Sequence, residues 1–173
     1  GLLIAFLRTI RISWLLIEPP NLVRRHMDFD TAVKLNIYET LARTTYAPTT
    51  NEVAQALNAP IEDVQAAFDR LHQKRLLVPE PDDRSRIRMA PPFSGIETPF
   101  RVMIDRKTYY ANCVWDSFGI PAALHQDAII DAQDGFDGKA IQLQIKNGQP
   151  VPQACLAHFA VPAAQWWKDI VYT

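Results

Sequence analysis

The segment from residue 30 to residue 89 constrains the fold most, because its sequence patterns predict three helices followed by a hairpin. Apolar residues recur at helical spacing over about 30–43, and Thr49 to Glu52 fits a capping box before a short second helix. A third helix begins at Pro60, a favoured first helical position. The apolar residues of this third helix follow one face: Ile61, Val64, Ala67, Phe68 and Leu71.

A hairpin follows the third helix. Residues 76–78 and 87–89 are strand-like, and the polar stretch 80–85 forms the tip between them. Three helices followed by a small hairpin are typical of a winged helix-turn-helix. We therefore predict a winged-helix-like domain over residues 27–92.

The charges of this domain argue against binding to duplex DNA. The third helix and the turn after it carry three acidic and three basic residues: Glu62, Asp63 and Asp69 against Arg70, Lys74 and Arg75. A helix that enters the major groove normally needs an excess of positive charge, and the whole chain has a net charge of -1. We expect no nucleic-acid partner and a domain that covers the second half of the chain. A winged-helix transcription regulator is the competing hypothesis.

The second half, residues 93–173, follows a proline-rich break and is dominated by strand patterns. Strands are predicted at 100–105, 127–132, 139–146 and 155–161, and Pro162 is predicted to begin a helix that runs to Val171. The fold class is therefore α+β. It combines a winged helix-turn-helix-like N-terminal part with a small mixed or antiparallel sheet core and its helices.

Cys113 and Asp116 form the candidate chemical pair. They lie three residues apart in a predicted helix over 111–118, which is expected to stop at Gly119 and Pro121, so they share one face. A helix N-terminus favours a thiolate, whereas a neighbouring carboxylate opposes it, so the two groups are expected to share a proton. Taken alone, a cysteine in an apolar helix is more often a small buried hydrophobe.

The flanks of this pair carry a family resemblance. Residues 109–116 are Tyr-Tyr-Ala-Asn-Cys-Val-Trp-Asp, and residues 119–124 are Gly-Ile-Pro-Ala-Ala-Leu. This stretch resembles the alkylmercury (organomercurial) lyase family, whose signature is a strand, a Tyr-rich turn and Cys-x-x-Asp on a helix that runs into an apolar Pro-Ala segment. The resemblance implies a helix-turn-helix-like N-terminal part that does not bind DNA. It also implies a lyase-like core over 93–173, truncated at its C-terminus.

The resemblance implies a carbon–mercury lyase acting on a small organomercurial. Cys113 would be a thiolate ligand of mercury, and Asp116 would handle the proton for the departing carbon and help to hold the Hg(II) product. Soft thiolates suit a soft metal, and an acid is needed to protonate carbon. No organic cofactor is implied. Mercury is the substrate and product metal, and external thiols are expected to remove it.

The family's second cysteine has no counterpart in this sequence. It follows a strand, a proline and a helical stretch like residues 159–172, which places it just beyond Thr173. Cys155 is the other thiol present. It either substitutes for the missing cysteine or has a buried structural role, and from its own sequence context we expect the structural role. The alternative function is therefore a non-catalytic metal- or ligand-binding module of the same fold.

Further expectations concern location and packing. Two cysteines are too few for a disulfide scaffold, which favours the cytoplasm, and no apolar run reaches the roughly 20 residues that span a bilayer. Residues 1–26 are either an amphipathic helix or a non-native segment ahead of Met27. Such a helix would pack on the body or on a second copy, giving a homodimer. His158 is expected in the core, and Trp166–Trp167 either in helix packing or as an aromatic wall beside an alkyl group.

Overall fold

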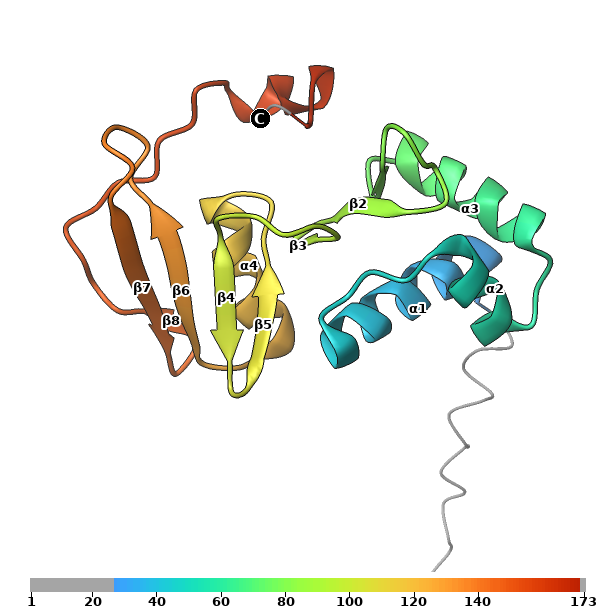
Figure 1. Ribbon diagram of the computed structural model, residues 1–173, viewed down its shortest axis with the longest axis horizontal. Coiled ribbons are helices and arrows are strands. Elements are labelled where there is room, and N and C mark those ends of the chain that lie inside the picture. The colour runs from blue at the N-terminus through green and yellow to red at the C-terminus, as the bar shows by residue number, and fades with distance from the viewer. Residues whose placement is uncertain (1–26, 172–173) are drawn as a thin grey trace, which may run out of the picture.

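The computed structural model describes residues 27–171 (Figure 1), so the prediction for residues 1–26 lies outside the described residues. Three helices come first: α1 (Phe29–Thr44), α2 (Thr50–Leu57) and α3 (Ile61–Gln73). The predicted capping box is present, because Thr49 Oγ1 accepts from the N–H of Glu52 and the Glu52 carboxylate accepts from the N–H of Thr49.

The winged part is completed by a three-stranded antiparallel sheet in the order β1-β2-β3. Its strands are β1 (Val78–Pro79), β2 (Ile87–Ala90) and β3 (Phe93–Ser94). The three helices and the hairpin confirm the predicted N-terminal half of the fold. β3 lies beyond the predicted hairpin and pairs with β2, so the proline-rich break is an ordered part of this sheet.

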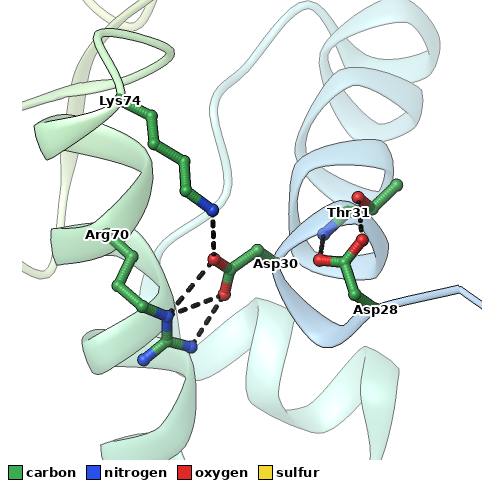
Figure 2. A network of polar contacts seen from close by, with 5 residues as sticks. All are labelled: Asp28, Asp30, Thr31, Arg70 and Lys74. Carbon is green, nitrogen blue, oxygen red and sulfur yellow. Dashed lines mark hydrogen bonds and ion pairs between the residues drawn. The ribbon is translucent and has the colours of Figure 1, made fainter.

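The first and third helices are joined by ion pairs, which Figure 2 shows at close range. Asp30 of α1 accepts from Arg70 at 2.7 Å and from Lys74 at 3.0 Å, and its side chain is only 12% exposed. Asp28 caps α1 by accepting from the N–H and hydroxyl of Thr31. Two basic residues at the end of α3 are therefore engaged within the protein.

The second half is a five-stranded antiparallel sheet in the order β5-β4-β6-β7-β8. Its strands are β4 (Arg101–Ile104), β5 (Lys107–Tyr110), β6 (Ala128–Gln133), β7 (Ala140–Lys146) and β8 (Gln149–Pro150). Helix α4 (Val114–Leu124) lies between β5 and β6 in the chain and packs against β4 and β6. The α+β class is confirmed, and both sheets are antiparallel rather than mixed.

One hydrophobic core runs through both halves, because buried residues of the three helices and of the five-stranded sheet belong to one cluster. Polar contacts reinforce this junction. The Tyr109 hydroxyl of β5 donates to the carbonyl of Ala42 at 2.8 Å, and the Tyr38 hydroxyl of α1 donates to the carbonyl of Pro91 at 2.8 Å. The helical part therefore covers the core that carries Cys113.

Four local predictions for the second half are wrong. Helix α4 continues through Gly119 and Pro121 to Leu124, because Pro121 and its neighbour Ile120 are buried and their packing outweighs the missing proline N–H. The Tyr-rich stretch expected as a turn is part of strand β5, so Tyr109 and Tyr110 lie on a strand. Residues 155–161 form no strand, since no partner strand pairs with them. The last predicted helix is a short 3-10 helix, η2 (Ala163–Lys168).

After β8 the chain returns across the end of the sheet toward β2 and α3 (Figure 1). Ring contacts agree with this path, because Trp167 lies 6.5 Å from His72 of α3 between ring centroids. Among the helices of residues 27–171, none has both the length and the apolar character needed to cross a bilayer.

Candidate functional site

Cys113 is the N-cap residue of α4, and its position follows from the strand before it. β5 ends at Tyr110, and the buried Ala111 then bridges to Phe93 of β3, so the chain turns there into α4. Cys113 has extended backbone angles, φ -153° and ψ 177°, as expected for an N-cap. The thiol is half-buried at the first turn of the helix.

Asp116 lies in the first turn of the same helix and has a fixed polar neighbour. The Asn112 side-chain nitrogen donates to Asp116 Oδ2 at 2.8 Å and to the carbonyl of Phe93 at 3.3 Å. Asn112 lies just before the N-cap residue, so its side chain reaches Asp116 in the first turn of α4 from outside the helix. The candidate carboxylate is thus tied to β3, the last strand of the winged part.

Burial sets the proton affinities of both candidate groups. The pKa of the Cys113 thiol is raised above its ordinary value, chiefly by burial and further by the Asp116 charge. The N–H groups of Asp116 and Trp115 oppose this rise, although the thiol makes no N-cap hydrogen bond of good geometry. Burial also raises the pKa of Asp116, against the hydrogen bond from Asn112. Desolvation therefore outweighs the effect of the helix N-terminus on the pKa of the thiol.

Cys113 and Asp116 lie on the wall of one cavity of about 630 Å³. The winged part contributes Arg75, Met89 and Pro91 to this wall, and the second half contributes Phe100, Asn112 and the start of α4. The remaining wall comes from the C-terminal segment, residues 158–171. Because most of these side chains are apolar, the cavity suits a small apolar ligand with one polar or metallic centre.

Aromatic rings dominate the C-terminal side of the cavity. Phe159 lies 5.3 Å from Trp166 and 6.5 Å from Trp115 between ring centroids. The Trp166 indole nitrogen donates to the carbonyl of Val161 at 2.8 Å, which fixes its ring. The guanidinium of Arg75 lies over Trp167 at 5.8 Å. Two roles were considered for Trp166 and Trp167, helix packing and an aromatic wall. Both residues lie on the cavity wall.

Cys155 is not on the wall of this cavity, and it is exposed. The expectation of a buried structural cysteine is therefore wrong, because the irregular segment around Cys155 has no sheet to pack against. His158 is exposed as well and lies at the cavity rather than in the core. Within residues 27–171, no group of three or more His, Cys, Asp or Glu side chains could hold a metal ion.

Two cavity residues escaped the sequence patterns. Asn112 was considered only as part of the motif, because its contact with Asp116 depends on the turn that precedes α4, which periodicity does not reveal. Arg75 was counted only for charge. It lines the cavity from the turn after α3, where its φ is 61°, a backbone conformation that periodicity does not reveal.

Comparison with known proteins identifies similar chains. The family model described as alkylmercury lyase, MerB, matches residues 93–173. Among solved structures, the chain is similar to the one titled "Crystal structure of the mercury-bound form of MerB2", with a TM-score of 0.59 and 21% identity. That match covers 78% of this chain and 64% of the other chain, so this chain spans less than two thirds of its length. No curated protein matches the sequence.

Proposed function

We propose that this chain cleaves the carbon–mercury bond of small organomercurials, because residues 93–173 match the alkylmercury lyase family model. One observation carries the proposal: a half-buried thiol and a half-buried acid, Cys113 and Asp116, line the same largely apolar cavity. A soft thiolate is the natural ligand of mercury, and carbon needs a proton as it leaves.

The proposed reaction balances with the groups at hand. The substrate enters as R–Hg–SR′, with a small external thiol already on mercury. The Cys113 sulfur bonds mercury, its proton passes to Asp116 and then to carbon, and the carbon–mercury bond breaks to give R–H. Mercury remains as Cys113–S–Hg–SR′. A second external thiol then releases Hg(SR′)₂ and restores the Cys113 thiol.

The raised proton affinities support this route. Burial raises the pKa of both Cys113 and Asp116, so Asp116 accepts the proton that Cys113 releases more readily than an exposed carboxylate would, and can pass it to carbon. Metal binding to a thiol releases its proton, which a nearby carboxylate can then accept. The thiol pool of the cytoplasm would supply the external thiols, and the cytoplasm is the proposed location.

A non-catalytic mercury-binding module is the second candidate. The observation in its favour is the position of Cys155, which is exposed and off the cavity wall. If turnover requires a second protein thiolate on mercury, Cys113 alone would bind the metal without releasing a hydrocarbon. Linear coordination would then be completed by a small thiol.

Benzene release from a phenylmercury salt in excess thiol separates the two candidates. The lyase proposal predicts multiple turnovers for the wild type, loss of activity in Cys113→Ser, and a large fall in Asp116→Asn. Cys155→Ser is the matched control and should retain activity. Stoichiometric mercury retention without benzene would instead support the binding module, and benzene release that survives Cys113→Ser would end the lyase proposal.

A further inference from the structure

Asn112 is the side chain that contacts the candidate acid, and both hydrogens of its amide nitrogen are engaged. One goes to Asp116 Oδ2 at 2.8 Å and the other to the carbonyl of Phe93 at 3.3 Å. Phe93 is itself held in place, because β3 pairs with β2 and bridges to Ala111. The amide therefore links Asp116 to a rigid point of the backbone.

The orientation of this amide follows from its partners. The Phe93 carbonyl can only accept, so exchanging the amide oxygen and nitrogen would set two acceptors against each other. The nitrogen must therefore face Asp116. In this orientation the buried Asn112 Oδ1 has no hydrogen-bond partner in the described part of the chain. An unpaired buried acceptor costs stability, so a residue kept only for packing would not need this arrangement.

We propose that Asn112 is a positioning residue for the lyase reaction, which holds one carboxylate oxygen of Asp116 so that the other faces the cavity. The inference rests on the proposed function. The terminal torsion of an aspartate has a broad energy minimum, so a hydrogen bond is needed to choose one orientation. Proton transfer to carbon is sensitive to small displacements of the donor, so the anchored oxygen improves the geometry of the free one.

A double-mutant cycle tests whether Asn112 acts through Asp116. Asn112→Leu has a similar size and removes both the donor and the unpaired acceptor. We expect kcat for benzene release to fall about 10- to 100-fold, with a smaller change in KM and no fall in melting temperature. In the Asp116→Ala background the same change should cost less than about twofold, because the carboxylate that Asn112 contacts is gone. Asn51→Leu, an exposed change on α2, is the control.

The opposite pattern overturns the inference. Equal losses of kcat in the two backgrounds, or a joint loss of stability and activity, would make Asn112 a structural residue. A readout without turnover separates this failure from failure of the proposed function. In the mercury-free protein, the NMR signals of the Asn112 side-chain NH₂ should move in Asp116→Ala and stay in Cys155→Ser. Unmoved signals in Asp116→Ala would exclude the pairing, whether or not the protein cleaves mercurials.

Discussion

Gly119 of α4 approaches Pro92 so closely that an added Cβ would lie 2.8 Å from the proline Cβ. Pro92 directly precedes β3, the strand to which Asn112 is anchored. The contact therefore fixes the helix that carries Cys113 and Asp116 against the segment that joins the two halves. Only a glycine at position 119 lets α4 lie this close to Pro92, and this packing places Cys113 and Asp116 in the site.

Gly119→Ala should destabilise the protein by about 1–3 kcal/mol, because the proline ring is stiff and α4 must shift to admit the methyl group. The higher helix propensity of alanine offsets only about 1 kcal/mol of this loss. Urea unfolding measures the change. Gly135→Ala is the matched control, since nothing lies within 4 Å of its added Cβ, and it should leave stability nearly unchanged. Equal stability of the two variants would contradict the close packing of α4.

Asp30→Asn should lower the free energy of unfolding by about 0.5–1 kcal/mol at low salt, because it breaks the pairs with Arg70 and Lys74. Salt should shrink the difference. The Arg70 hydrogen bond is the chief cause that lowers the pKa of Asp30. Its stabilisation is therefore present above the ordinary value of 3.8 and is lost as the pH falls below it. Urea unfolding at two salt concentrations and several pH values checks both trends.

The same variant tests the transcription-regulator hypothesis. In the wild type, Asp30 engages two of the basic residues at the end of α3, as Figure 2 shows. We expect neither the wild type nor Asp30→Asn to bind a DNA duplex at physiological salt. Salt-sensitive binding by the wild type would revive the regulator hypothesis, because phosphate contacts would then have to come from another face.

Much of the fold could be predicted because its signals are local. The capping box at Thr49 and the alternation before Asn147 report structure within a few residues, and both predictions are confirmed. The failures depend on distant partners. Pro121 stays inside α4 because its surroundings bury it, and residues 155–161 form no strand because no other strand pairs with them.

The candidate site was predictable only in part, for the same reason. The spacing of Cys113 and Asp116 indicated a shared face, and both residues lie on one cavity wall. Their burial depends on Arg75, Met89 and Pro91 from the winged part and on the C-terminal segment. These contacts join residues far apart in the chain, so residue spacing did not reveal the desolvation that raises the pKa of the thiol.

Cys113 should react slowly with iodoacetamide at pH 8, because burial raises its pKa and the thiolate is the reactive form. The rate should keep rising as the pH passes above the ordinary value of 9.0. Asp116→Asn removes the nearby charge that also raises this pKa, so it should speed alkylation at pH 8. Peptide mass spectrometry follows each cysteine separately. The exposed Cys155 is the internal control, and an unchanged Cys113 rate in Asp116→Asn would argue against an electrostatic coupling.

Trp166→Ala should weaken binding of aryl substrates more than alkyl ones, because Trp166 and Phe159 form the aromatic side of the cavity. We expect KM for phenylmercury to rise about tenfold, which corresponds to the loss of about 1.4 kcal/mol, and KM for methylmercury to rise less. Steady-state release of benzene and methane gives both values. Trp115→Ala is the control, since Trp115 is 63% exposed and not on the cavity wall. An equal rise for both substrates would exclude an aromatic wall for the aryl group.

Native mass spectrometry of a single turnover tests the central role of Cys113 and Asp116 most directly. One equivalent of phenylmercury is added with a small thiol, and the adducts are followed in time and mapped to their cysteines. The account predicts a phenylmercury adduct on Cys113 that becomes a mercury adduct without the phenyl group, an adduct that persists in Asp116→Asn, and none at this position in Cys113→Ser. A phenyl group that stays on mercury in the wild type, or that is lost from an adduct on Cys155, would contradict it.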